Sequence, residues 1–187
     1  KKFDLVNENF EFRIFKYPDK LIEATLAQPP DLACFSNYCW NLDLGYSIAE
    51  RLKERRPETI IIFGGPNYPT VENEQKEFLE NYPIIDFHTY KESEVAFAEL
   101  LTGLVNHAFN VEEIKAAKPK GCHYLLNGQM VAGEPAERIK NLDEIPSPYL
   151  TGLLDEFFDP TLIPLIQTNR GCPFACTFCV EGLNYYN

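Results

Sequence analysis

The sequence predicts an α/β fold with a doubly wound parallel sheet for most of the chain. Short apolar runs alternate with longer amphipathic segments between residues 10 and 110. One run, residues 59–63 (TIIIF), is almost wholly apolar, as is typical of a strand that is covered on both faces. In addition, 45% of the 187 residues are hydrophobic, which suffices for a packed core.

The first elements are expected to be a strand, a helix and a second strand. Residues 10–17 (FEFRIFKY) alternate apolar and polar side chains with the period of a strand. Residues 19–28 have the composition of a short helix. Residues 32–36 (LACFS) form an expected buried strand, in which Cys34 would be a small core residue.

The clearest helix is expected at residues 43–57, because apolar residues recur there at helical spacing and Asp43 can cap the first turn. The alternation then continues. The remaining expected elements are the strand at 59–63, a surface helix at 71–83, a strand at 84–90, and a helix at 93–106 with Ser93 as its cap.

A change of pattern follows. Asn127-Gly128 lies between two short apolar runs and predicts a type I′ hairpin near residues 121–132. The charged, proline-containing stretch 137–150 indicates a linker, and residues 161–168 (TLIPLIQT) a fresh strand. The expected organisation is a first domain at 1–140, a linker at 141–160 and the start of a second domain at 161–187.

Charge and composition narrow the function classes. The formal net charge is −11, which repels phosphate backbones and argues against a nucleic-acid partner. No apolar run is long enough to span a membrane, and no signal peptide is recognisable, so we expect neither a membrane partner nor secretion. The six cysteines are not spaced as a disulfide framework, which favours a reducing, cytoplasmic setting.

Three cysteines, Cys172, Cys176 and Cys179, are spaced C-x3-C-x2-C directly after the expected strand 161–168. A structural zinc site usually has four ligands in two pairs. Three thiolates on a [4Fe-4S] cluster instead leave one iron open to a substrate or cofactor. The alternatives are a redox-active pair, Cys176 and Cys179, and three cysteines gathered by chance.

The stretch RGCPFACTFC resembles the cluster loop of radical S-adenosylmethionine (SAM) enzymes, whose pattern places an aromatic residue, here Phe178, before the third cysteine. The resemblance implies that the three cysteines ligate a [4Fe-4S] cluster and that the open iron chelates SAM. It also implies reductive cleavage of SAM to a 5′-deoxyadenosyl radical, a backbone contact near Phe178 to the adenine, and a reductant protein such as flavodoxin or ferredoxin. The family's catalytic domain is a β/α barrel, of which residues 161–187 would be the start.

Unusual loops follow three expected strands, at residues 35–41, 63–69 and 90–94. Because ligands bind beyond the carboxyl ends of parallel strands, these loops should meet at one edge. Gly64 and Gly65 would let a bulky ligand approach the backbone. Neutral polar and aromatic residues in the first loop are Ser36, Asn37, Tyr38, Trp40 and Asn41.

This arrangement over residues 10–145 resembles the Rossmann-like (flavodoxin-like) cobalamin-binding domain of many radical SAM enzymes. Its recurring features are Ser and Asn after one strand, Gly-Gly-Pro after the next and an acidic turn after a third. The resemblance implies contacts to the corrin and its nucleotide tail from Ser36, Asn37, Tyr38, Asn41, Gly64, Gly65, Pro66, Glu92 and Glu94. A domain that has lost cobalamin is the alternative.

Two departures from the family are visible. The family's first strand and helix are not found before Phe10, so we expect the start of the domain to be trimmed. The D-x-H-x-x-G motif of some cobalamin domains is imitated by Asp86, His88 and Lys91, but Lys91 replaces the glycine and the position differs. We therefore interpret His88 as an ordinary strand or loop histidine.

Three function classes follow. The chain is expected to be part of a cobalamin-dependent radical SAM enzyme, in some relatives a methyltransferase, and to be inactive by itself because most of the barrel is missing. The alternatives are a radical SAM enzyme with a docking domain in place of a cobalamin domain, and a non-enzymatic iron–sulfur or Rossmann-like binding module. The substrate, a small molecule or peptide, is not identified by these residues.

Overall fold

The computed structural model describes residues 4–167 and 169–179 of the chain. The chain divides after Lys140 into two compact units.

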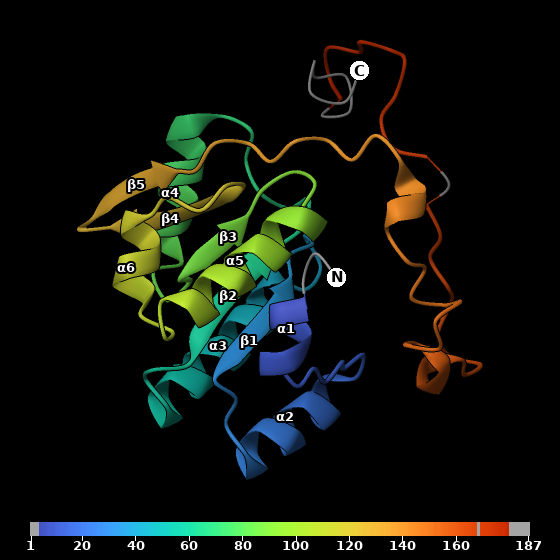
Figure 1. Ribbon diagram of the computed structural model, residues 1–187, viewed down its shortest axis with the longest axis horizontal. Coiled ribbons are helices and arrows are strands. Elements are labelled where there is room, and N and C mark those ends of the chain that lie inside the picture. Colours follow the sequence, from blue (N-terminus) through green and yellow to red (C-terminus); the bar gives the residue numbers. More distant parts are fainter. Residues whose placement is uncertain (1–3, 168, 180–187) are drawn as a thin grey trace. The chain divides into compact units, whose positions relative to one another are not determined.

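The first unit is built on a mixed five-stranded sheet with strand order β1-β2-β3-β4-β5 (Figure 1). The first three strands are parallel, and the last two join them antiparallel. The α/β class is thus confirmed. The expected parallel pairing holds for β1, β2 and β3, whereas the hairpin makes the whole sheet mixed, and the described strand order has no reversal of the kind found in doubly wound sheets. The strands are β1 (Leu32–Ser36), β2 (Ile60–Gly64), β3 (Phe87–Thr89), β4 (Cys122–Leu126) and β5 (Gln129–Ala132).

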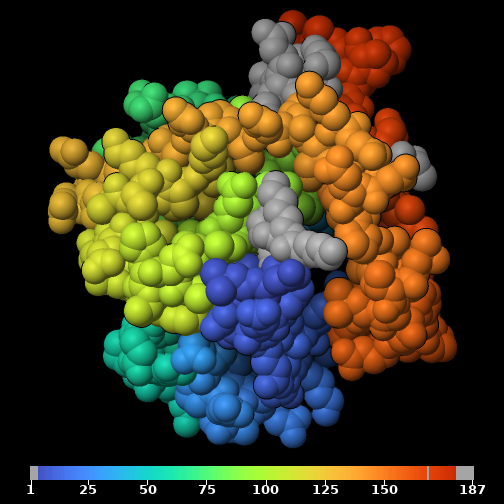
Figure 2. All heavy atoms as spheres, in the orientation of Figure 1, coloured from blue at the N-terminus to red at the C-terminus, as the bar shows by residue number. Residues whose placement is uncertain are grey.

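Helices cover both faces of the sheet (Figure 1). On one face, α1 packs against α5, and the two lie side by side in the space-filling view (Figure 2). The helices of this face are α1 (Asp4–Asn9), α5 (Glu94–Asn106) and α6 (Val111–Ala116). Those of the other face are α2 (Pro18–Ala27), α3 (Leu42–Arg55) and α4 (Glu72–Asn81).

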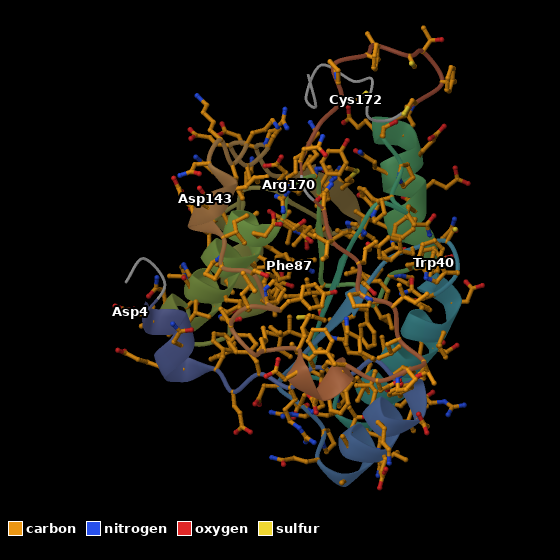
Figure 3. All side chains as sticks on the ribbon, turned by 90° about the vertical axis from the view of Figure 1, so that its right-hand side faces the viewer. Asp4, Trp40, Phe87, Asp143, Arg170 and Cys172 are labelled. Atoms are coloured by element: carbon orange, nitrogen blue, oxygen red, sulfur yellow. The ribbon has the colours of Figure 1, made fainter. Side chains whose placement is uncertain are left out.

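Two cores follow from the alternation of side chains along the strands. Ile60 and Ile62 of β2 face the core under α5, whereas Ile61 and Phe63 face the core under α3. Phe87 of β3 lies in the middle of the domain and is completely buried (Figure 3). The central strand β2 is buried on both faces, as its apolar run predicts.

Two local signals in the sequence had different outcomes. The hairpin is confirmed, since Asn127 (φ 51°) and Gly128 (φ 74°) form the two-residue turn between β4 and β5 with the positive φ that a type I′ turn needs. The expected cap of α3 is wrong. Asn41 is its N-cap, and Asp43 lies in the first turn, where its charge favours the helix dipole.

Two expected strands are absent. Residues 10–17 contain no strand, and no described strand pairs with them. Phe10 instead closes α1 through a backbone hydrogen bond to Val6 and packs edge-on against Phe109. Residues 161–167 also contain no strand, and residue 168 lies outside the described residues. Alternation alone does not make a strand, because the backbone also needs a neighbour to pair with.

The described part of the second unit has little regular structure. It contains two short 3₁₀ helices, Leu142–Glu144 and Asp155–Phe157. The Tyr149 hydroxyl donates to the carbonyl of Leu165 at 3.2 Å and accepts from its amide at 3.1 Å. The remainder of the expected start of the second domain, residues 180–187, lies outside the described residues.

Among residues 4–167 and 169–179, no helix combines the length and the apolar character that crossing a bilayer requires.

Candidate functional site

The three loops singled out in the sequence follow the carboxyl ends of β1, β2 and β3. Ser36 pairs in register with Gly64, and Gly64 pairs with Thr89. Since the three strands are parallel, the loops that follow them begin at one edge of the sheet, as expected. This edge with its loops, residues 36–41, 64–69 and 90–94, is called the carboxyl rim below.

Asn37 ties the first loop of the rim to the second. Its side-chain amide donates to the backbone carbonyl of Asn67 at 2.7 Å, and its side-chain oxygen accepts from the side-chain amide of Asn67 at 3.1 Å. Its backbone N–H donates to Gly64, and its carbonyl accepts from the Asn67 N–H. Asn37 is completely buried. Its observed role is therefore to link the two loops, and the expected ligand contact stays a prediction.

Gly64 and Gly65 allow close packing between neighbouring parts of the carboxyl rim. A Cβ at Gly64 would strike the Thr89 hydroxyl, and one at Gly65 would meet the Asn37 backbone, 2.9 Å from its nitrogen. Gly65 also has φ +144°, which side chains with a Cβ rarely adopt. Contacts within the chain thus require both glycines even without a ligand, and the close approach of a ligand stays a prediction.

The exposed part of the first loop carries polar and aromatic groups. Asn41 accepts from the Tyr38 backbone N–H at 2.7 Å and donates to the Ser36 hydroxyl at 2.9 Å. Tyr38 stacks on Trp40 with ring centroids 4.6 Å apart, and Trp40 is 76% exposed at the surface (Figure 3). This stack offers a flat apolar surface beside a hydroxyl group.

The acidic turn after β3 is partly used by the chain itself. Glu92 is buried, forms an ion pair with Arg138 at 3.3 Å and accepts from the Ile139 backbone N–H at 2.8 Å. Its carboxylate therefore holds residues 138–139, and its expected ligand contact stays a prediction. Glu94 is exposed in the first turn of α5. Lys91, in the glycine position of the imitated motif, has the left-handed φ of 66°.

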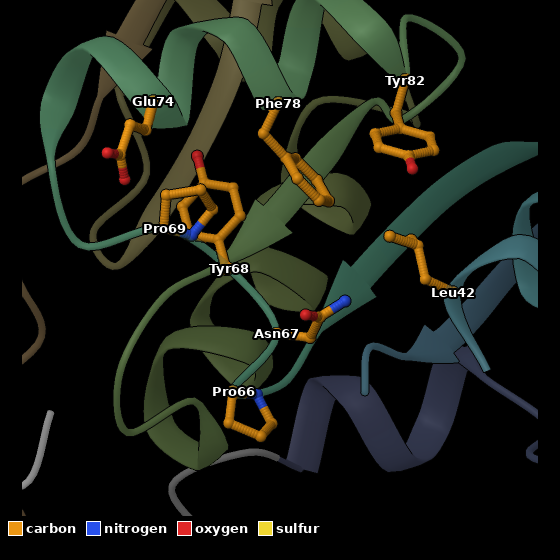
Figure 4. Close-up of a pocket in the computed structure, with 8 residues that line it drawn as sticks. All are labelled: Leu42, Pro66, Asn67, Tyr68, Pro69, Glu74, Phe78 and Tyr82. Atoms are coloured by element: carbon orange, nitrogen blue, oxygen red, sulfur yellow. The ribbon is translucent and has the colours of Figure 1, made fainter. Parts of the chain in front are cut away.

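An open pocket of about 380 Å³ adjoins the rim (Figure 4). The loop residues 66–69 form one wall, Leu42 of α3 contributes to the lining, and α4 supplies Glu74 and Phe78, with Tyr82 just beyond its end. Of the residues predicted to bind a ligand, Pro66 lines this pocket. The lining residues from α3 and α4, together with Tyr82, were missed because the sequence pattern does not reveal which loop a helix packs beside.

A buried aromatic and histidine cluster underlies the rim. Tyr68 stacks on His88 with ring centroids 3.9 Å apart, and its hydroxyl lies 3.2 Å from Nδ1 of His123. Burial, and then the charge of His123, lower the pKa of His88 to about 3, against a smaller opposing effect of the Thr89 backbone. Burial, and then Lys91, lower the pKa of His123 to about 4. Both rings are therefore neutral at pH 7.

The cysteine loop lies in the second unit. Cys172 is half-buried, Cys176 and Cys179 are exposed, and the Cys179 amide donates to the Cys176 carbonyl at 3.2 Å. Phe178 is 91% exposed. Over residues 4–167 and 169–179, no three metal-ligating side chains converge on one point. The loop thus presents three thiols with the chemistry that iron–sulfur clusters take, and the metal site stays a prediction.

The scattered cysteines differ in accessibility. Cys34 has solvent-accessible surface on the edge strand β1, so its expected place in the core is corrected, although the protein crowded around its thiol raises the pKa to about 12. Cys122 is buried in β4, and burial raises the pKa of its thiol to about 12. Both thiols are therefore protonated at neutral pH.

The chain is similar in sequence to curated methyltransferases. It is 34% identical over 160 residues to the 2-(S-pantetheinyl)-carbapenam-3-carboxylate methyltransferase of Streptantibioticus cattleyicolor. It is equally similar to the cobalamin-dependent radical SAM methyltransferase TokK of Streptomyces tokunonensis. Both alignments cover 82% of the chain and 22% of the relative. A hopanoid C-3 methylase of Methylococcus capsulatus is 30% identical over 80% of the chain and 28% of its own length.

The solved structure of OxsB, a cobalamin-dependent S-adenosylmethionine radical enzyme, shares the fold. The TM-score is 0.62 at 23% identity, over 87% of this chain and 22% of that one. No family model matches the chain. The chain thus matches between 22% and 28% of the length of these curated relatives.

Proposed function

We propose, from the premise that this chain is homologous to cobalamin-dependent radical SAM methyltransferases, that it is part of such an enzyme. In this proposal the first unit binds cobalamin at the carboxyl rim, and the second unit carries the thiols of a [4Fe-4S] cluster. The observation that carries the proposal is the rim, where three loops gather beside a pocket of about 380 Å³.

The groups at the carboxyl rim suit the binding of a large, partly apolar ligand better than that of a small anion. The stacked rings of Tyr38 and Trp40 and the apolar walls of the pocket suit a flat macrocycle with an aromatic tail. Ser36 and Asn41 add neutral hydrogen-bonding groups at its surface. Among the predicted contacts, Ser36, Tyr38, Asn41 and Pro66 are the best candidates, because none of them is buried.

The second unit would contribute the metal ligands. Cys172, Cys176 and Cys179 would hold three irons, and the backbone near Phe178 would lie beside the adenine of SAM. When bound, the cluster would supply the electron for reductive cleavage of SAM, and cobalamin would supply methyl-transfer chemistry. A small reductant protein such as flavodoxin or ferredoxin would deliver the electron. The exposed thiols are accessible for cluster assembly.

A second function is docking of a catalytic domain by a first unit that binds no cobalamin. Two observations favour it: Asn37 and Glu92, both expected ligand contacts, are buried and bonded within the chain. The two functions differ in corrin uptake, which only the first requires.

The proposal is tested by anaerobic reconstitution of the chain with iron, sulfide and hydroxocobalamin, followed by iron, sulfide and corrin analysis. We expect a [4Fe-4S] cluster and one corrin per chain. Cys176→Ala should lose the cluster, while the matched control Cys34→Ala should retain it, because soft thiolate ligands are needed at the irons. A full cluster in Cys176→Ala would refute the cysteine assignment, and a cluster without corrin would favour docking.

A further inference from the structure

His88 lies beneath the carboxyl rim in a fully enclosed position. It is completely buried in β3 and pairs across the sheet with His123 of β4. Nε2 of its ring lies 3.1 Å from the side-chain nitrogen of Asn37, and its face stacks on Tyr68. His88 therefore contacts one residue from each of the first two loops of the rim.

The hydrogen-bond pattern fixes the position of the ring proton. The backbone carbonyl of Asn67 determines the orientation of the Asn37 side-chain amide, because a carbonyl can only accept and Asn37 Nδ2 donates to it. In this orientation Asn37 Oδ1 accepts from the side-chain amide of Asn67. The Asn37 atom that faces His88 is therefore a donor. Nε2 of His88 must accept, so the ring is neutral and carries its proton on Nδ1. The pKa of about 3, lowered by burial and by His123, agrees with this form.

The other ring nitrogen has no obvious structural use. Nδ1 of His88 is buried and makes no hydrogen bond to any described residue. A buried donor without a partner costs stability, so an apolar ring would suit this place better if packing alone mattered. What the histidine adds is the acceptor that faces Asn37.

We propose that His88 is a positioning residue of the carboxyl rim, which fixes the pocket wall formed by residues 66–69 through its bond to Asn37 and its stacking on Tyr68. The inference rests on the proposed function where it concerns cobalamin. The Asn37 amide uses one hydrogen for Asn67 and the other for His88. Loss of the second bond frees Asn37 to turn, and the loop that Asn37 holds loses its anchor.

Amide hydrogen exchange tests this without any ligand. The reporters are the N–H groups of Asn37 and Asn67, which bond to Gly64 and Asn37 respectively. In His88→Phe, which keeps a stacking ring but lacks the acceptor, we expect their exchange to rise about tenfold, as for the loss of one hydrogen bond. His88→Gln, which can accept from Asn37, should remain within about threefold of the wild type. Exchange in His88→Phe equal to the wild type would overturn the inference.

A second measurement decides the case if His88→Phe fails to fold. Nitrogen-15 NMR of the wild-type ring should show a protonated Nδ1 and a bare Nε2 at pH 7, without titration between pH 5 and 8. A proton on Nε2, or titration in that range, would overturn the inference.

Titration with hydroxocobalamin separates the two proposals. If the wild type binds, His88→Phe should bind about tenfold more weakly and His88→Gln nearly normally, as for one hydrogen bond. Equal affinity in wild type and His88→Phe would overturn the role toward the corrin. If the wild type takes up no corrin, the proposed function fails, and amide exchange still decides the role of His88 in the loop.

Discussion

Replacing Gly65 with alanine should be the most damaging small substitution in the carboxyl rim. The new Cβ would strike the Asn37 backbone, whose atoms cannot move aside as a flexible side chain would. The φ of +144° is also strained for any residue with a Cβ. Either the loop shifts or the strain remains, and in both cases the hydrogen bonds that Asn37 forms with Gly64 and Asn67 are weakened.

The size of the effect can be worked out from these two causes. A residue with a Cβ in a glycine-only backbone conformation costs about 1–3 kcal/mol. Weakening the two backbone hydrogen bonds of Asn37 adds about 1 kcal/mol. We therefore expect the free energy of unfolding to fall by about 2–4 kcal/mol. With a urea m-value of about 2 kcal/mol/M, the midpoint of unfolding should drop by about 1–2 M.

Two other glycines provide matched controls. Gly128 has φ +74°, but no other atom lies within 4 Å of the place a Cβ would take, so Gly128→Ala should cost about 1 kcal/mol from conformation alone. Gly103 lies within α5 and has the same open space, so Gly103→Ala should stabilise by about 0.5–1 kcal/mol. Urea unfolding followed by circular dichroism gives all three values. A Gly65→Ala protein as stable as Gly128→Ala would refute the packing argument.

Three further predictions follow from buried groups. The folded pKa values of His88 and His123 lie below the unfolded value of 6.5, so the unfolded chain takes up protons first as the pH falls. The free energy of unfolding should therefore drop by about 2 kcal/mol per histidine between pH 7 and pH 5. Equal urea midpoints at the two pH values would contradict this. Glu92→Gln weakens a buried ion pair and should cost about 1–2 kcal/mol in the same assay; no loss would mean that the pair contributes nothing. At pH 8, a thiol reagent should label exposed Cys39 but not Cys122 in the folded chain; rapid labelling of Cys122 would contradict its burial.

Local patterns in the sequence predicted the elements best. Asn127-Gly128 identified the hairpin because the turn depends on those two residues alone. The run 59–63 identified β2 because a strand buried on both faces has few polar residues. The apparent strand at 10–17 was misread, since alternation says nothing about whether a pairing neighbour exists. The short helices α1 and α6 were missed because six residues are too few to show a period.

For the candidate site, too, some features could be predicted from the sequence and others could not. Topology placed Ser36 and Gly64 at one edge, because parallel strands have their carboxyl ends together. The contacts of single residues were harder to predict from the sequence. The ligand contact of Asn37 stays a prediction, and its partners within the chain were not predicted: Asn67, 30 positions away, and His88, 51 positions away. Such pairs have no trace in the spacing of residues along the chain.

The most direct test of the central claim is the affinity of the chain for hydroxocobalamin, measured by absorbance titration under anaerobic conditions. We predict that the wild type binds, that Trp40→Ala binds about tenfold more weakly through loss of aromatic surface, and that Glu58→Gln, a change away from the rim, binds as the wild type does. Absence of binding by the wild type, or equal binding by all three proteins, would contradict a cobalamin site at the carboxyl rim.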